Sequence, residues 1–260
     1  MSLKPHERIA ASLREACAGG TPGLVAFLTA GYPSRERFRA DLAAIAAEAD
    51  VVEIGVPFTD PMADGVTIQR SSREALRQGV TLTWILSELK ALAPQPTPLV
   101  LSGYLNPLLA YGYARLASDA AAAGVCGFIV PDLPLDESAP LRTALDREGL
   151  ALIQMVTPVT TPERMARLCQ ASQGFVYAVT MTGTTGKGAA VPAEIGAYLR
   201  RVRELAKVPV CAGFGIRSPA QVAQLRGQVD AVIVGSALVE VLERGESPQA
   251  WLAALRSAGP

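Results

Sequence analysis

Residues 51–65 read Val-Val-Glu-Ile-Gly-Val-Pro-Phe-Thr-Asp-Pro-Met-Ala-Asp-Gly. The first six predict a buried strand that is apolar except for Glu53. A carboxylate rarely enters such a run, because burying an ionised group without a partner costs several kcal/mol. The loop behind the strand adds Asp60 and Asp64. We therefore expect the chemistry of this protein at the end of this strand.

This strand is one of eight apolar runs that alternate along the chain with helical patterns. The expected strands span residues 24–31, 51–56, 98–104, 127–133, 150–156, 175–180, 208–216 and 231–235. The expected helices span residues 35–49, 83–92, 114–123, 137–148, 162–170, 194–205, 219–225 and 237–242, with 5–17 before the first strand and 248–256 at the end. Apolar strands that alternate with helices indicate a parallel sheet covered on its outer side. For 260 residues this predicts an α/β fold, a single-domain (β/α)8 TIM barrel over residues 1–260 with an extra N-terminal helix.

A doubly wound, Rossmann-like sheet is the alternative architecture. It would need Gly-x-Gly-x-x-Gly after a strand, with an acidic residue further on. The nearest match, Gly-Phe-Gly at 213–215, continues as Arg-Ser-Pro at 217–219 and breaks that pattern. The sequence favours the barrel.

Composition limits the possible partners and surroundings. Lysine and arginine total 24, as do aspartate and glutamate, so no bulk field attracts nucleic acid or an anionic membrane. The longest apolar runs are too short for a membrane span, and the N-terminus lacks a signal-peptide core. The cysteines lie at positions 17, 126, 169 and 211, without CxxC spacing. We expect a cytoplasmic protein that binds neither nucleic acid nor membranes.

The alternation of side chains along a strand predicts the face on which Glu53 lies. Val51, Glu53 and Gly55 share one face, and the purely aliphatic other face suits the helix layer. Glu53 should therefore point into the barrel, just below the carboxyl-end mouth where active sites of this fold lie. The alternatives are a structural glutamate paired with a buried arginine, or a wrongly assigned strand.

The two aspartates of the following loop have structural interpretations too. Asp60 precedes a proline and is typical of a turn. Asp64 precedes a glycine and a helical pattern, so it could be a helix N-cap.

Glycines at the ends of the last two strands suggest a phosphate site. Gly213 and Gly215 end the seventh strand, and Gly235 and Ser236 lie between the eighth strand and a helix. Barrels that bind phosphorylated substrates often hold the phosphate there, against unpaired amides at a helix N-terminus. The alternative is ordinary turn glycines with Ser236 as the N-cap.

Other residues narrow the chemistry further. Residues 182–190, rich in glycine, threonine and alanine, could form a lid or an inert loop. His6 is the one histidine, which excludes a histidine triad or a multi-histidine metal site, and we expect no metal. No lysine falls within an expected strand, which disfavours a Schiff base. Carboxylate acid–base chemistry on a phosphorylated substrate remains.

Residues 51–65 resemble the signature of the tryptophan synthase α subunit. Further similar stretches lie, in order, at 27–33, 67–69, 104–107, 131–134, 182–186 and 213–216. Val66 departs from the family, which usually has proline there; this could loosen the loop but leaves both carboxylates in place.

The resemblance implies retro-aldol cleavage of indole-3-glycerol phosphate to indole and glyceraldehyde 3-phosphate. Glu53 would be the general acid and base, and Asp64 would accept the indole N–H. The other positions that match substrate-binding residues of the family are Phe27, Tyr177, Thr185 on the lid, and the phosphate cradle Gly186, Gly213, Gly215, Gly235 and Ser236. On sequence alone, Phe27 would be an ordinary core aromatic.

The resemblance also implies a partner, the tryptophan synthase β subunit, in an α2β2 heterotetramer. Pyridoxal phosphate is expected only in that β subunit, so this chain should carry no cofactor. Pro57, Asp60 and Asn106 match the surface that faces β. These loops could instead serve only the fold.

Three other functions stay open. One is a free-standing lyase that releases indole without a β chain, and another is a catalytically idle scaffold that activates β. A third is a barrel isomerase acting on another sugar phosphate. Phe27 and the Glu53–Asp64 pair favour an indole substrate over the last of these.

Overall fold

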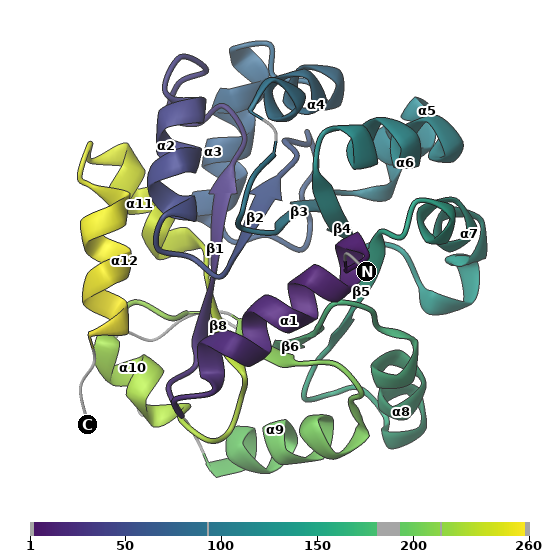
Figure 1. Cartoon of the computed structure of the whole chain (residues 1–260), viewed down its shortest axis with the longest axis vertical. Helices are drawn as coiled ribbons and strands as arrows, with labels where there is room; N and C mark the ends of the chain where they lie inside the picture. Colours follow the sequence, from purple (N-terminus) through teal and green to yellow (C-terminus); the bar gives the residue numbers. More distant parts are fainter. Residues whose placement is uncertain (1–2, 93, 181–192, 214, 258–260) are drawn as a thin grey trace.

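The computed structural model describes residues 3–92, 94–180, 193–213 and 215–257. Eight parallel strands form a closed barrel in chain order, from β1 round to β8 and back to β1 (Figure 1). They are β1 (Gly23–Thr29), β2 (Val51–Gly55), β3 (Leu99–Ser102), β4 (Val125–Ile129), β5 (Ala151–Val156), β6 (Val176–Val179), β7 (Val210–Gly213) and β8 (Ala231–Val234). The predicted (β/α)8 barrel is confirmed.

Helices surround the barrel (Figure 1). They are α1 (Pro5–Cys17), α2 (Phe38–Ala46), α3 (Val66–Arg77), α4 (Leu82–Ala91), α5 (Leu105–Tyr111), α6 (Tyr113–Ala122), the 3-10 turn η1 (Leu135–Glu137), α7 (Ala139–Arg147), α8 (Pro162–Ala171), α9 (Ala193–Leu205), α10 (Pro219–Gln224), α11 (Ser236–Glu243) and α12 (Pro248–Arg256). Helix α5, immediately after β3, was not expected, and the strand predicted at 127–133 was placed too late in the chain. Proline at 131 cannot donate to a sheet, so β4 ends before it.

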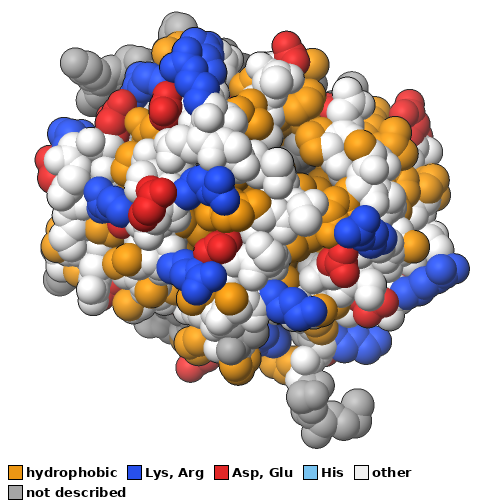
Figure 2. Space-filling view, turned by 90° about the horizontal axis from the view of Figure 1, so that it is seen from above, with side chains coloured by type: hydrophobic (Ala, Val, Ile, Leu, Met, Phe, Trp, Pro, Cys, Tyr) orange, Lys and Arg blue, Asp and Glu red, His pale blue; other side chains and the backbone are white. Residues whose placement is uncertain are grey.

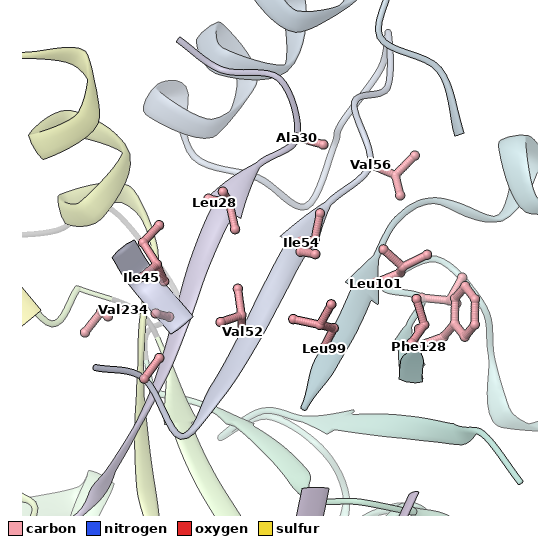
Figure 3. Packing of buried hydrophobic residues seen from close by; sticks show 14 of the residues in the cluster. Leu28, Ala30, Ile45, Val52, Ile54, Val56, Leu99, Leu101, Phe128 and Val234 are labelled. Carbon is pink, nitrogen blue, oxygen red and sulfur yellow. The ribbon is translucent and has the colours of Figure 1, made fainter. Parts of the chain in front are cut away.

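The side chains of β2 alternate between the two faces of the barrel wall, as the sequence predicts. Val52, Ile54 and Val56 pack in one buried cluster with Ile45 of α2 (Figure 3). Val51 belongs instead to the cluster enclosed by the strands. Glu53 shares the face of Val51, so it points into the barrel. This expectation is confirmed.

Helix α1 closes the end of the barrel opposite the site. It lies across that end in Figure 1, and its Ile9 and Leu13, both fully buried, join the interior cluster. Its first turn is held by the Lys4 N–H, which donates to Glu7 Oε2 at 2.8 Å. Helix α1 thereby covers the end of the interior that lies opposite the carboxyl ends of the strands.

The surface mixes charges of both signs. Figure 2 shows basic and acidic side chains interspersed with apolar ones over one face of the molecule. Among the described residues, no helix combines the length and apolarity needed to cross a membrane.

Candidate active site

Glu53 is buried in the barrel interior and forms no ion pair with any residue that the structure describes. Its side chain is 5% exposed, and Oε2 has no hydrogen-bond partner among the described residues. None of the ion pairs in this part of the chain involves it, so it is not the glutamate of a structural arginine pair. Burial raises the pKa of Glu53 from 4.5 to about 7; a hydrogen bond with Ser102 opposes the rise, and the charge of Asp64 adds to it. Such a group can both give and take a proton near neutral pH.

Asp64 is held at the mouth beside Glu53. Its Oδ2 accepts a hydrogen bond from the Tyr104 hydroxyl at 3.0 Å, and its carbonyl accepts one from the Gln69 side chain at 2.9 Å. Burial raises the pKa of Asp64 to about 6, against the lowering effect of the Tyr104 hydrogen bond. Gly65 is the N-cap of α3, so the N-cap interpretation of Asp64 is wrong.

Tyr104 is a site residue to which the sequence analysis assigned no role. It is 3% exposed and stacks on Phe58 with ring centroids 5.0 Å apart. Its hydroxyl accepts from the Ala63 N–H at 2.9 Å while donating to Asp64. The usable signal was its position, since an aromatic hydroxyl directly behind a barrel strand lies at the carboxyl-end mouth.

Two aromatic rings fill the interior beside these carboxylates, and each is accommodated by a glycine. A Cβ at Gly213 would lie 2.5 Å from the phenolic oxygen of Tyr177. A Cβ at Gly55 would lie 2.6 Å from Cζ of Phe27. Burial, together with the charges of Glu53 and Asp64, raises the pKa of Tyr177 well above its ordinary value, so the phenol stays protonated. Gly213 therefore has a packing reason to be glycine, separate from any phosphate.

A small cavity at the mouth is lined by some of these groups. Its walls include Phe27, Gly55, Asp64, Ser102 and Tyr104, but not Glu53 or Tyr177. Apolar rings and a carboxylate thus face one small space of about 30 Å³.

The start of α11 offers free amides near this cavity. Gly235 is its N-cap and Ser236 its first residue, with no side-chain cap. The interpretation of Ser236 as N-cap is therefore wrong, and among the described residues no side chain caps the first amides of α11. Gly215 has a φ of +81°, which only glycine adopts easily. Thr185, Gly186 and the whole 182–190 loop lie outside the described residues.

In the part of the chain that the structure describes, no cluster of three or more histidine, cysteine, aspartate or glutamate side chains could hold a metal ion.

Comparison with known proteins places this chain in a family. The family model for the tryptophan synthase alpha chain matches residues 13–257. The chain belongs to the tryptophan synthase alpha chain family. Membership brings a role in tryptophan biosynthesis, as the α subunit.

Curated relatives and solved structures agree with this membership. The chain is 47% identical over 249 residues to the tryptophan synthase alpha chain of Nitratidesulfovibrio vulgaris, covering 95% of this chain and 97% of the relative. It is 42% identical to that of Geobacter sulfurreducens, covering 96% and 98%. Tryptophan synthase from M. tuberculosis, in an aminoacrylate-bound form, superposes with a TM-score of 0.87 at 35% identity, covering 96% of this chain and 98% of that one. The alpha subunit from Legionella pneumophila gives 0.86 at 33% identity, covering 99% and 98%.

The positions that resemble the family's partner surface differ in exposure. Asp60 and Asn106 are exposed, whereas Pro57 is buried. Asp60 also forms a turn, since its carbonyl accepts from the Met62 N–H at 2.9 Å. Four of the five large apolar side chains exposed in the described chain follow carboxyl ends of strands: Met62, Val66, Leu109 and Val159. Exposed apolar side chains thus follow several strand ends at the mouth of this tryptophan synthase alpha chain.

Proposed function

We propose that this protein cleaves indole-3-glycerol phosphate into indole and glyceraldehyde 3-phosphate by a retro-aldol reaction. The observation that carries the proposal is the pair of carboxylates Glu53, which is buried, and Asp64, which is half-buried at the mouth; both have raised pKa values, and neither forms an ion pair among the described residues. Two carboxylates in an apolar pocket can exchange protons with a neutral aromatic substrate near pH 7.

The reaction needs two proton transfers, and Glu53 can perform both. Protonated Glu53 gives its proton to indole C3, which places positive charge on the indole nitrogen. The resulting carboxylate then takes the proton of the glycerol hydroxyl next to the breaking bond. The C–C bond electrons return to the ring as the aldehyde forms. Asp64 accepts the indole N–H throughout, and this hydrogen bond strengthens as the nitrogen becomes electron-poor.

The remaining contacts orient the substrate. Phe27 and Tyr177 would flank the indole, consistent with their buried positions at the interior wall. The uncapped start of α11 at Gly235 and Ser236, with the loop at Gly213 and Gly215, would hold the phosphate. By family resemblance we assign Thr185 and Gly186 to a lid that completes the pocket.

We also propose docking of a pyridoxal-phosphate-dependent β subunit on the mouth, in an α2β2 assembly. The support is the exposed apolar set that includes Met62 and Val66. Both belong to the segment that follows β2 and carries Asp64. A partner that binds this segment would therefore influence the position of the Asp64 carboxylate. Asp60 and Asn106 would contact the partner, and Pro57 would shape the loop from beneath. The cofactor would belong to β alone.

An assay of indole release from the phosphorylated substrate tests the function. We expect turnover by the purified chain that rises when β subunit is added, and Glu53→Gln and Asp64→Asn should each lower kcat by orders of magnitude. Glu204→Gln, exposed on the outer helix α9, is the matched control and should keep full activity. Near-normal cleavage by folded Glu53→Gln would refute the role of Glu53. Rapid turnover alone that is indifferent to β would favour a free-standing lyase, and no cleavage in either case would favour a scaffold.

A further inference from the structure

The barrel wall opens between β4 and β5 at their carboxyl ends. The last residue pair between these strands is Ile129↔Ile153, whereas β5 continues along β6 as far as Val156. Beyond Ile129 the chain turns away through the segment 130–135. A cavity of about 290 Å³ lies between this segment, the end of β5 and α8. Cavities that hold small ligands begin at about 300 Å³, so this one suits a small molecule.

Gln154 is the unexplained residue of this cavity. It belongs to the face of β5 that packs on the helices, like Leu152 and Val156, and it is only 6% exposed. Its backbone N–H donates to Ser172 Oγ at 2.9 Å, but its side-chain amide has no hydrogen-bond partner among the described residues. Its amide atoms are not among the fully enclosed side-chain atoms that lack a partner, so they border the open space of the cavity. On a face that is otherwise apolar, a polar group at the edge of a cavity suits a ligand that can hydrogen-bond with it.

Arg164 of α8 gives the same cavity a positive charge. Its guanidinium lies 3.3 Å from Asp136, but Asp136 also pairs with Arg167. One carboxylate thus faces two guanidiniums, so Arg164 can still pair with a further anion, while Asp132 on the same lining adds a negative charge of its own. Leu152 and Leu168 supply an apolar wall beside it.

We propose that this cavity, the β4–β5 site, binds a small carboxylate with an apolar body, about the size of one amino acid. Arg164 and the amide N–H of Gln154 would hold the carboxylate, and the wall formed by Leu152 and Leu168 would cover the apolar body. The site is distinct from the catalytic cavity, with which it shares the single lining residue Pro131. It does not depend on the proposed reaction.

Calorimetry with two probes tests the site on the full chain. L-Phenylalanine and phenylacetate share the carboxylate and the apolar body, but only L-phenylalanine carries an ammonium group. Asp132 also lines the cavity, so tighter binding of L-phenylalanine than of phenylacetate would indicate that Asp132 recognises the ammonium group. We expect at least one probe to bind with one-to-one stoichiometry. Gln154→Met and Arg164→Gln should each weaken it about tenfold or more, the effect of losing a hydrogen bond to a charged group. Arg115→Gln, an exposed ion-paired arginine on α6, should leave the affinity unchanged.

A second readout separates binding from folding. Because the Gln154 amide has no partner to lose, Gln154→Met should keep or raise the melting temperature while lowering affinity. If that variant failed to fold, Arg164→Gln would decide, since Arg164 is 44% exposed and its loss leaves Asp136 paired with Arg167. The proposal is overturned if neither probe binds at millimolar concentration, if both variants bind like the parent, or if glycerol phosphate displaces the probe. A soaked crystal that shows only water in the cavity would also overturn it.

Discussion

The chemistry of single residues at this site depends first on burial and then on one or two neighbours. Glu53 is the clearest case, because it is a buried carboxylate with one oxygen unpaired among the described residues. Its ionisation is opposed by burial, so the same placement that suits proton transfer reduces stability once the carboxylate is charged.

We therefore predict that Glu53→Gln stabilises the protein at high pH. Below about pH 4.5 folded and unfolded states both hold the proton, so Glu53 contributes no pH dependence. Between 4.5 and about 7 the unfolded state loses the proton first, and folding stability falls as pH rises. The variant lacks this loss and should be about 3 kcal/mol more stable than the parent at pH 8, with the difference shrinking towards pH 4. Urea unfolding across this range measures it; a constant difference would contradict the raised pKa.

A second prediction concerns Tyr104, a positioning residue for Asp64. Tyr104→Phe removes the hydrogen bond that lowers the pKa of Asp64, so that pKa should rise further above about 6. Asp64 must be ionised to accept the indole N–H, so the acid limb of the kcat profile should move to higher pH. We expect kcat at pH 7 to fall about 10- to 100-fold, as for a lost hydrogen bond to a charged group.

Tyr111→Phe is the matched control for Tyr104→Phe. Tyr111 donates to Asp119 Oδ2 at 2.6 Å, but on the outer helices. Its loss should leave the pH profile unmoved. An unshifted profile in Tyr104→Phe itself would show that Tyr104 does not act through Asp64.

Two glycines at the proposed phosphate cradle should respond differently to alanine. Gly213→Ala brings Cβ to within 2.5 Å of the Tyr177 hydroxyl, so the ring must move and both melting temperature and kcat should fall. Gly235→Ala meets nothing closer than 3.8 Å, so the fold should persist while affinity for glycerol phosphate drops. Melting curves and calorimetry distinguish the two. Unchanged affinity in Gly235→Ala would count against the cradle at α11.

At the scale of elements, α3 connects the two halves of the proposed site. It begins at Val66, two residues after Asp64, and its Thr67 donates to Glu240 of α11 at 3.1 Å. Glu240 also pairs with Arg217 behind β7 at 2.8 Å. A network of polar contacts thus ties the start of α3 to the two elements that border the expected phosphate position.

The start of α3 can be made more rigid at Val66. This residue is the first of the helix and 77% exposed, and Gly65 before it is extended with φ −74° and ψ 166°. Proline suits both conditions, since the first helical N–H has no helical partner and an extended residue tolerates a following proline. Val66→Pro should raise the free energy of unfolding by about 0.4–1 kcal/mol, measured in urea, by restricting the unfolded chain. Val66→Ala controls for loss of the branched side chain; destabilisation by proline alone would contradict the expectation.

At the scale of the whole molecule, one helix outside the strand–helix alternation completes the core. Leu13 of α1 is fully buried against the interior of the barrel. Leu13→Ala should lower the free energy of unfolding by about 2–5 kcal/mol through lost burial and a residual cavity. KM and kcat measured well below the melting temperature should stay near the parent values, because the site is at the other end. Leu3→Ala, 54% exposed, should change stability by less than about 0.5 kcal/mol. A small effect of Leu13→Ala would show that α1 does not close the core.

The sequence by itself determined the eight-strand alternation and the inward direction of Glu53, because element type and side-chain face follow from local periodicity. Its motifs also brought Glu53 and Asp64 together as a pair. Only the tertiary structure decided that Tyr104 holds Asp64 and that Gly213 makes room for Tyr177. It likewise decided that the wall parts between β4 and β5. These contacts join residues that lie far apart along the chain, and they depend on strand register and barrel closure, which no local pattern encodes.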